Sequence, residues 1–138
     1  MQITLRSVKT NLISKSLILQ ICKLKDSHWK NGVSSQFKFF KKNCKENDIN
    51  NLMYYKNKLI GYTLLRRKQL LVGNKKKKYL HFDTLILNKK YRNSGLSYLL
   101  MNFNNFIIEK NKLYSFLLCE KKLVKFYRKF KWSIQKKK

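Results

Sequence analysis

Residues 85–100 read LILNKKYRNSGLSYLL, and this stretch decides the fold. An apolar strand is expected to end at Leu87, a polar loop follows, and the small residues around Gly95 predict the start of a helix. Backbone N–H groups at a helix start have no partner inside the helix, and the helix dipole adds partial positive charge there. Gly95 carries no Cβ, so phosphate oxygens can approach the backbone closely. The stretch therefore predicts an anion site at residues 93–97, although an ordinary helix start with Ser94 as its cap has the same pattern.

Strands and helices alternate outward from this stretch in both directions. Alternating polar and apolar residues predict strands, whereas apolar residues three and four positions apart predict helices. The first half is expected to hold a strand at 2–8, a helix capped by Asn11 or Ser14, and a helix capped by Ser34 or Ser35 with Phe37, Phe40 and Cys44 on its apolar face. A polar turn at 46–51 leads to strands at 52–55 and 58–71 around a Lys56–Asn57 turn, then to a turn at 73–78 and a strand at 79–87. The remaining elements are a helix at 95–111, a fully buried strand at 114–119, a helix at 121–131 and the beginning of a strand at 132–135. This order predicts an α/β fold with one mixed sheet and about four helices, formed by a single domain over residues 1–138.

The charge of the chain is extreme for its length. Lys and Arg total 33 against 6 acidic residues, so the formal net charge is +27 over 138 residues. Such a surface attracts polyanions, which include nucleic acid, anionic membranes and phosphorylated ligands. An AT-rich coding sequence would also favour Lys over Arg, but it would not remove Asp and Glu. The composition leaves two explanations open: coding drift, and selection for an anionic partner.

The three cysteines, Cys22, Cys44 and Cys119, stand apart from one another and form no CxxC pair. An odd number of cysteines without metal-ligand spacing predicts reduced thiols, with neither a disulfide framework nor a metal site. The longest early apolar run, at residues 17–22, is too short for a signal-peptide core or a membrane span. These features predict a cytoplasmic protein with no membrane span.

Arg92, Gly95 and Ser97 form an R-x-x-G-x-S motif, and a pair of leucines follows in the expected helix. In its place between an apolar strand and a helix, this motif resembles the [QR]-x-x-G-x-[GA] signature of the GNAT superfamily of N-acetyltransferases. Ser97 stands where the family usually has Gly or Ala, and Lys89 stands where it often has Pro. Neither difference removes the reason for anion binding at bare backbone N–H groups.

Two further segments extend the resemblance to about residues 50–132. Residues 116–132 (FLLCEKKLVKFYRKFKW) are similar to the family's fifth strand and fourth helix, which typically end in F-Y-x-x-x-G-F. Phe126 and Tyr127 match the first pair of that pattern, while Lys and Trp replace its closing Gly and Phe. Residues 51–65 are similar to the hairpin of the second and third strands, with its glycine in the usual place.

The resemblance implies acetyl-CoA as cofactor and direct attack of a primary amine on its thioester. The cofactor would lie in a splay between the strands at 79–87 and 114–119. Backbone groups of Leu85 and Leu87 would bond the pantetheine arm, and the Leu87 N–H would also face the developing oxyanion. Arg92 is also expected to bind a phosphate, and this expectation rests only on its positive charge. The residues expected to bind the cofactor are Leu85, Leu87, Arg92, Asn93, Ser94, Gly95, Leu96 and Ser97.

Acetyl transfer also needs a proton donor for the leaving thiolate and a base for the amine. The resemblance assigns Tyr127 as the donor. Asp83 and His81 are the candidate bases, because their spacing puts both on one face of a strand, together with Leu85 and Leu87. Each candidate base has an ordinary alternative, which is a bond to a lysine or to the backbone for Asp83 and a satisfied surface position for His81.

His28 and Trp29 lie in the loop expected between the first two helices, which the family often uses to bind the acceptor. The acceptor itself is a small-molecule or protein amine that the sequence does not identify. A strongly basic surface favours acceptors that carry phosphate or carboxylate, such as an amino sugar or a nucleotide-linked amino sugar.

Two other functions compete with this one. The charge and the aromatic content fit a basic nucleic-acid or ribosome-binding module, although no zinc, helix-turn-helix or RNP-like pattern is present. The second rival is a truncated GNAT domain that binds cofactor without turnover. In that case, C-terminal strands would be short, missing or supplied by the partner in a homodimer.

Overall fold

The computed structural model describes residues 2–135, which form one five-stranded sheet and four α-helices. The strands are β1 (Ile3–Lys9), β2 (Ile49–Tyr55), β3 (Lys58–Val72), β4 (Lys75–Leu87) and β5 (Tyr114–Phe116), and the helices are α1 (Lys15–Asp26), α2 (Val33–Asn43), α3 (Leu96–Lys110) and α4 (Val124–Arg128). The strands lie side by side in chain order, with β1 to β4 antiparallel and β5 parallel to β4. The predicted α/β fold with a mixed sheet is therefore confirmed.

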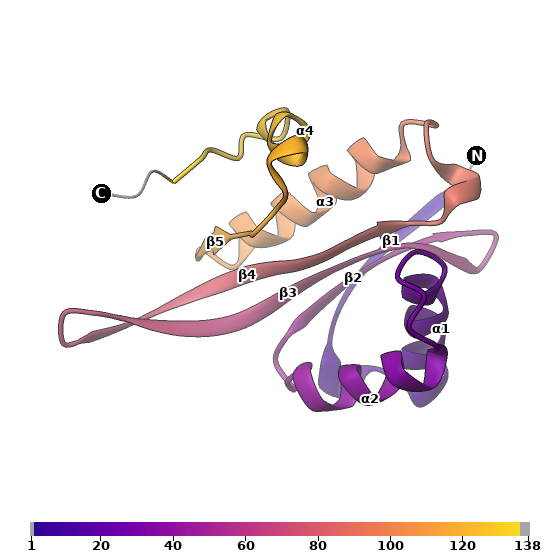
Figure 1. The fold of residues 1–138 in the computed structure, drawn as a ribbon, viewed down its shortest axis with the longest axis horizontal. Coiled ribbons are helices and arrows are strands. Elements are labelled where there is room, and N and C mark those ends of the chain that lie inside the picture. The colour runs from indigo at the N-terminus through magenta and orange to yellow at the C-terminus, as the bar shows by residue number, and fades with distance from the viewer. Residues whose placement is uncertain (1, 136–138) are drawn as a thin grey trace.

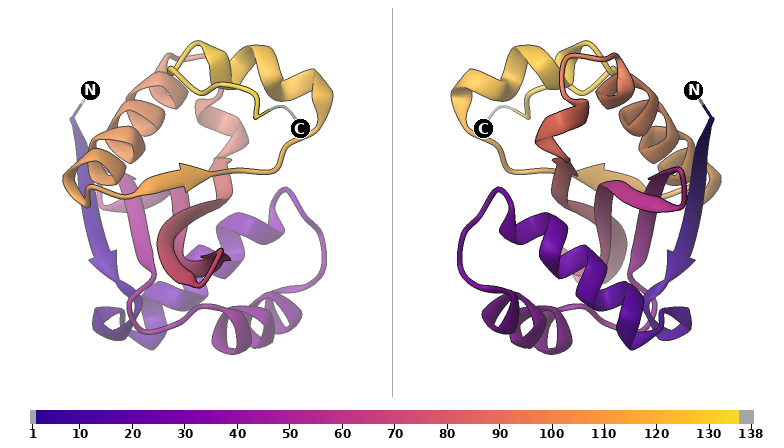
Figure 2. Two further views of the ribbon diagram at one scale, coloured as in Figure 1. Left: turned by 90° about the vertical axis from the view of Figure 1, so that its left-hand side faces the viewer. Right: turned by 90° about the vertical axis from the view of Figure 1, so that its right-hand side faces the viewer.

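A helical layer covers each face of the sheet. Helices α1 and α2 lie on one face, and α3 and α4 lie on the other (Figure 1). The end-on views show the sheet between these two layers (Figure 2). Ile21 and Phe40 of the first layer pack with Tyr62, whereas Met101 of α3 packs with Leu80 of β4. A side chain of β4 that packs in the first core therefore points toward α1 and α2, and one that packs in the second core points toward α3.

The N-termini of the first two helices differ in how they are capped. Ser14 caps α1 as predicted, since its side chain accepts a hydrogen bond from the backbone N–H three residues on. The expected caps of α2 are wrong, because Ser34 and Ser35 lie inside the helix and Gly32 precedes it. Gly32 has φ of 86°, and its N–H donates to the Asp26 carboxylate, which holds the loop in a conformation that favours glycine. The apolar face expected for α2 packs into the core through Phe37, Phe40 and Cys44.

The segment 46–51 is a polar turn only at its start, contrary to expectation, because β2 begins within it. Asn50 and Asn51 are fully buried in this strand. The Asn50 carbonyl oxygen accepts a hydrogen bond from the Tyr62 hydroxyl, and the Asn51 amide donates to Asn104 of α3. Polar side chains can occupy a central strand when they find such partners, and a hydropathy pattern does not reveal those partners.

The chain after α3 is less regular than predicted. Strand β5 has only three residues, and the side chains of Tyr114 and Leu118 are 80% and 91% exposed, so this segment is not buried on both faces. The helix expected at 121–131 is reduced to a 3₁₀ turn followed by α4. Residues 132–135 form no strand, and none follows β5 in the part of the chain that the structure describes. Strand β5 therefore leaves one sheet edge open, in line with the expectation of missing C-terminal strands.

The two hairpins of the sheet have tight turns. Lys56 and Asn57, with φ of 50° and 60°, form the predicted turn between β2 and β3. The turn between β3 and β4 is shorter than the predicted 73–78, because Lys75 to Lys78 belong to β4 and pair with β3. The lysines were assigned to the turn for their charge, but only two residues are needed to reverse the chain.

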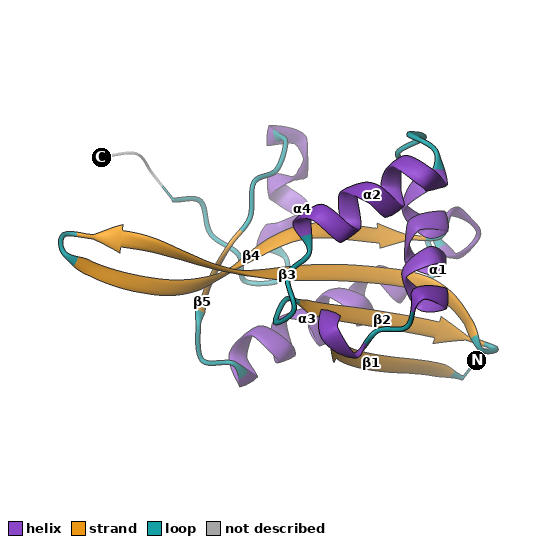
Figure 3. Cartoon of the chain, turned by 90° about the horizontal axis from the view of Figure 1, so that it is seen from below, coloured by secondary structure: helices purple, strands orange, loops and turns teal. Residues whose placement is uncertain are grey.

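Strands β3 and β4 extend well beyond the rest of the sheet. Strand β2 pairs with β3 only as far as Leu65, so residues 66–78 extend past it as a ribbon, in which residues 69–78 pair only with one another. Figures 1 and 3 show this ribbon reaching away from the helices and from the shorter strands β1 and β2. We refer to residues 66–78 as the basic ribbon.

Candidate active site

The site begins where β4 and β5 separate. Their parallel pairing covers only residues 79–81 of β4 and 114–116 of β5. Strand β4 then continues to Leu87, paired on its other side with β3. Beyond His81, the β5 side of β4 therefore has no strand partner among residues 2–135. This divergence is the splay that the family resemblance implied.

Backbone groups of β4 point into this splay. The Asn88 N–H donates to the Ile60 carbonyl of β3 at 2.7 Å, so Asn88 faces β3. Residues alternate in direction along an antiparallel ladder, and Ile86 therefore also faces β3, while Leu85 and Leu87 face the splay. The Leu87 carbonyl accepts a hydrogen bond from Arg92 Nε at 3.1 Å. This arrangement leaves the N–H groups of Leu85 and Leu87 and the Leu85 carbonyl directed at the space where β5 has departed.

Helix α3 lies close to the sheet and begins beside this splay. Gly61 of β3 permits the approach, because a Cβ there would lie 3.1 Å from Leu100 of α3 and 3.2 Å from Met53. Leu96 and Leu100 pack with Leu87 in the same core. The first turn of α3 is thereby fixed at the carboxyl end of β4.

The first turn of α3 presents bare N–H groups. Gly95 precedes the helix in the left-handed region, with φ of 81° and ψ of −4°, and no side chain caps the helix. Asn93 is also left-handed, with φ of 63°. Within residues 2–135, no protein group accepts a hydrogen bond from the backbone N–H groups of residues 93–97. Ser94 is not the cap, since its hydroxyl donates to the Tyr91 carbonyl. The ordinary capped helix start is therefore not what the structure contains, and the N-terminus of α3 can accept an anion.

Arg92 forms hydrogen bonds that hold the loop between β4 and α3, and it also adds positive charge to that loop. Its Nε donates to the Leu87 carbonyl, and its Nη2 lies 3.2 Å from Nδ1 of His28. Arginine has only donors, so Nδ1 of His28 accepts and the ring proton lies on Nε2. Two of the five N–H donors of Arg92 are thus used within the protein, and the rest of the guanidinium remains for a ligand.

The loop between α1 and α2 reaches the same end of β4. The contact with Arg92 brings His28 to the phosphate loop, although the two residues are 64 positions apart. Trp29 packs edge-on against His28, with ring centroids 4.8 Å apart, and is 41% exposed. The two residues expected to bind the acceptor therefore lie together beside the candidate cofactor site.

Tyr127 of α4 approaches the splay from the face that α3 covers. Its ring lies edge-on to Phe82 of β4, with centroids 6.0 Å apart, in the core that also includes Leu85. Burial raises the pKa of Tyr127 above the ordinary value of 10, with a smaller contribution from Cys119. The phenol therefore keeps its proton at neutral pH, as a proton donor must.

A β-bulge in β4 overturns one prediction about the candidate bases. Leu64 of β3 faces Thr84, but Leu65 faces Phe82, so Asp83 is an extra residue in β4. The bulge breaks the alternation of side chains. As a result, Leu85 packs under α3, whereas Asp83 faces the layer of α1 and α2. The expectation that His81 and Asp83 share a face with Leu85 and Leu87 is therefore wrong.

His81 and Asp83 stay together on the face of α1 and α2. Burial lowers the pKa of the His81 imidazole below 6.5; Asp83 raises it, and Lys68 and Arg66 lower it further. Nδ1 of His81 is buried and has no hydrogen-bond partner among the described residues. Asp83 forms an ion pair with Arg66 at 3.6 Å, and not with a lysine as its ordinary alternative supposed. Of the two candidates, His81 is the more available proton acceptor at neutral pH.

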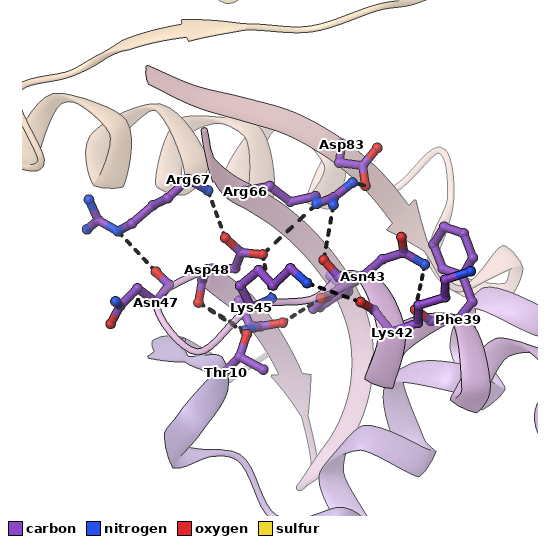
Figure 4. Close-up of polar contacts among 12 residues, drawn as sticks. Thr10, Phe39, Lys42, Asn43, Lys45, Asn47, Asp48, Arg66, Arg67 and Asp83 are labelled. Atoms are coloured by element: carbon purple, nitrogen blue, oxygen red, sulfur yellow. Dashed lines mark hydrogen bonds and ion pairs between the residues drawn. The ribbon is translucent and has the colours of Figure 1, made fainter. Parts of the chain in front are cut away.

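Arg66 links Asp83 to a buried carboxylate that sequence patterns did not identify. Asp48 is 1% exposed and accepts hydrogen bonds from the backbone N–H groups of Lys45 and Arg67 at 2.9 and 2.8 Å. Arg66 Nε lies 4.0 Å from Asp48, and its Nη2 donates to the Asn43 carbonyl at the end of α2. Figure 4 shows Asp48 at the centre of these contacts. The cluster ties the α2–β2 connection to β3 and so fixes the strand next to His81.

Replacing Asp48 by alanine is expected to destabilise the fold by about 3 kcal/mol. The change would leave the two N–H donors of these partly buried hydrogen bonds without an acceptor and would remove a counter-charge from Arg66. Urea unfolding followed by circular dichroism measures the effect. The control is Asp26→Ala, since that exposed carboxylate accepts a hydrogen bond from Gly32 and should cost about 1 kcal/mol or less. Equal losses for the two variants would contradict a structural role for the Asp48 cluster.

Comparisons with known proteins identify the fold. No family model matches the sequence, and no curated protein matches it in a sequence search. Among solved structures, an acetyltransferase from Trypanosoma brucei has a TM-score of 0.73 at 14% identity, over 99% of this chain and 96% of that one. A glucosamine-6-phosphate N-acetyltransferase from Arabidopsis thaliana has a TM-score of 0.68 at 13% identity, over 98% and 95% of the two chains. A GNAT family acetyltransferase from Staphylococcus aureus has a TM-score of 0.65 at 18% identity, over 87% of each. The chain therefore has the fold of the GNAT acetyltransferases, as its sequence predicted.

Proposed function

We propose that this protein is an acetyl-CoA-dependent N-acetyltransferase that acts on a primary amine. The observation that carries the proposal is the bare N-terminus of α3, where the N–H groups of residues 93–97 have no protein acceptor within residues 2–135. It lies at the end of β4 where the backbone of Leu85 and Leu87 faces the splay. A diphosphate and an extended amide arm would find complementary groups at these two adjacent places.

The residues present fit the cofactor. The N–H groups of Asn93 to Ser97, with Arg92 beside them, would hold the diphosphate. A Cβ added at Gly95 would meet no protein atom within 4 Å, so the space in front of this turn is open. The N–H groups of Leu85 and Leu87 and the carbonyl of Leu85 would bond the pantetheine amides. When bound, acetyl-CoA supplies an acyl group already activated as a thioester.

The reaction needs two proton transfers, one to the leaving thiolate and one from the amine, and residues on opposite faces of β4 would carry them out. Tyr127 packs over Phe82 on the face of α3 and α4, and it would donate a proton to the leaving thiolate. His81 lies on the opposite face, where it would take a proton from the amine, directly or through water. His81 and Phe82 are neighbours in β4 and point to opposite faces, so these two roles would lie on different faces. Asp83 itself would orient Arg66. The Leu87 N–H would donate to the oxyanion.

The acceptor would enter from the side of the α1–α2 loop. His28 and Trp29 lie there against Arg92, so the pocket would combine an aromatic wall with positive charge. Such a pocket suits an amine that also carries a phosphate, for example an amino sugar or its nucleotide-linked form. One similar structure is, by name, a glucosamine-6-phosphate N-acetyltransferase, and that name describes an amino sugar that carries a phosphate.

We place the protein in the cytoplasm because its three cysteines are free thiols, which suits a reducing compartment. None of the described helices is long and apolar enough to cross a membrane.

A binding titration followed by a turnover screen tests the proposal. Calorimetry should detect acetyl-CoA binding to the intact chain, and thiol release should then be measured over amino sugars, phosphorylated amino sugars, polyamines and peptide N-termini. The proposal expects binding together with turnover on at least one class of amine. Binding without turnover would leave a cofactor-binding domain, and no binding at near-millimolar cofactor would overturn the proposal.

Replacing His81 by glutamine is expected to remove the acid limb of the kcat/KM profile and to lower kcat about tenfold or more. Because burial lowers the pKa of His81 below 6.5, the imidazole is neutral at pH 7 and should become protonated only in more acidic solution. Wild-type activity should therefore hold from pH 7 to about 6.5 and fall below it. The control is His28→Gln, which removes the chain's only other histidine and should retain the acid limb. An unchanged profile in the His81 variant would exclude His81 as the base.

A further inference from the structure

The basic ribbon carries a large positive charge that the fold does not use. Between residues 66 and 78 there are seven basic residues and no acidic one. Arg66 and Arg67 are held by the Asp48 cluster, but the four consecutive lysines Lys75 to Lys78 are exposed. No carboxylate within residues 2–135 forms an ion pair with any of these four lysines. Charge of this density, held on a projecting element, costs free energy unless an anion neutralises it.

Exposed aromatic side chains lie beside this charge. Tyr114 and Phe116 of β5 are 80% and 44% exposed, which is unusual for aromatic residues of a short strand. Phe116 packs edge-on against Tyr79 at the base of the ribbon, with ring centroids 5.5 Å apart. The open edge of β5 thus presents ring faces directly next to the lysines.

A groove brings the two features together. It has a volume of about 800 Å³ and lies between the ribbon, β5 and the segment after α4. Lys77, Lys78, Arg128 and Lys131 supply positive charge along it, while Tyr79, Tyr114 and Phe116 supply aromatic surface. No acidic residue lines it within the described part of the chain. A second cleft, lined by both basic and acidic residues, shares Lys78 and Tyr79 with it.

We propose that this groove binds single-stranded nucleic acid, with the lysines on the phosphates and the aromatic rings stacked on bases. Single-strand binders combine a basic groove with exposed aromatic platforms, and both occur here on adjacent strands. The exposed rings on an open sheet edge favour a ligand with flat bases over an anionic membrane. The four lysines and Tyr114 have no role in the proposed acetyl transfer, although the groove also includes Tyr127, the proposed proton donor.

Fluorescence anisotropy with a labelled oligouridine of about 20 nucleotides tests the charge component. The test variant replaces Lys75, Lys76, Lys77 and Lys78 by glutamine together. Each lysine that neutralises a phosphate adds about 0.7 to the slope of log K against log salt, so the slope should fall by up to about 3 and the affinity by about tenfold or more. The matched control replaces four exposed lysines of α1 and α2, Lys23, Lys38, Lys41 and Lys42, and loses the same charge. Equal losses in the two variants would overturn the proposal by showing nonspecific attraction.

The aromatic component is tested with Tyr114→Ser, because this side chain is 80% exposed and its loss should not affect the core. The variant should weaken oligouridine binding about fivefold or more but leave heparin binding unchanged, since heparin has charge and no bases. An equal effect on both ligands, or none on either, would overturn base stacking. Binding of the wild type to phosphatidylserine vesicles without binding to oligouridine would overturn the proposal in favour of a membrane surface. Acetyl-CoA binding by the lysine variant should be unchanged, which separates this test from the test of acetyl transfer.

Discussion

Replacing Gly95 by valine should weaken acetyl-CoA binding by about tenfold to hundredfold. A β-branched residue is strained at φ of 81°, and relief of that strain would turn the backbone N–H groups away from their present direction. The new side chain would also occupy the space in front of the helix. No protein atom lies within 4 Å of the added Cβ, so a loss of binding could not be explained by a clash of that Cβ within the protein. Calorimetric titration of the variant with acetyl-CoA measures the effect.

Gly32 provides the matched control for this experiment. It also precedes a helix, has φ of 86°, and a Cβ there would meet nothing within 4 Å. The Gly32→Val variant should lose thermal stability at least as much as the Gly95 variant but keep its affinity for acetyl-CoA. If both variants bind the cofactor as the wild type does, Gly95 is not at the diphosphate.

Replacing Tyr127 by phenylalanine should lower kcat by about a hundredfold to a thousandfold and leave acetyl-CoA affinity nearly unchanged. The ring would keep its contact with Phe82, so only the hydroxyl is lost. Loss of the proton donor raises the barrier to thiolate departure, whereas the diphosphate and pantetheine contacts lie on other elements. Steady-state rates of thiol release, together with a cofactor titration, separate the two effects.

Tyr98→Phe is the control for the Tyr127 variant. Tyr98 lies on α3, is 48% exposed and packs against Phe130. This contact does not bring its hydroxyl to the splay. Its variant should keep wild-type kcat. A Tyr127 variant with unchanged kcat would remove Tyr127 from the chemistry and return its role to packing.

Local sequence signals predicted the parts of the fold that depend on local physics. The start of α3 was predicted from the small residues around Gly95. Gly95 takes the left-handed conformation there, which glycine adopts more readily than any other residue. The turn at Lys56 and Asn57 and the cap at Ser14 follow from similar short-range preferences. The order of elements was also correct, and the resemblance to the GNAT superfamily implied the splay between β4 and β5.

The bulge at Asp83 could not be predicted, because it depends on the register of β3 against β4. Strict alternation is the only rule that a single strand provides, and one extra residue reverses every side chain after it. For the same reason, the two candidate bases were placed on the wrong side of β4 relative to Leu85 and Leu87. The register depends on contacts between distant residues, such as the ion pair of Arg66 in β3 with Asp83 in β4.

Long-range partners explain the other differences. Arg92 was expected to serve phosphate alone, but it also binds the Leu87 carbonyl and His28, which lies 64 positions away. Asn51 was assigned to a turn for its polarity, although its side-chain N–H donates to Asn104 of α3 in the core. Strand β5 reads as a buried strand because its residues are apolar, yet nothing in the described chain covers its outer edge. That open edge is what makes the groove beside the basic ribbon accessible.

The most direct test of the central claim is the change in backbone amide NMR signals when acetyl-CoA is added to the assigned protein. We predict that the largest shifts occur at residues 93–97 and at the N–H groups of Leu85 and Leu87, with little change at the tip of the basic ribbon. Shifts confined to the ribbon, or none at saturating cofactor, would contradict the account, because the start of α3 would then not be where coenzyme A binds.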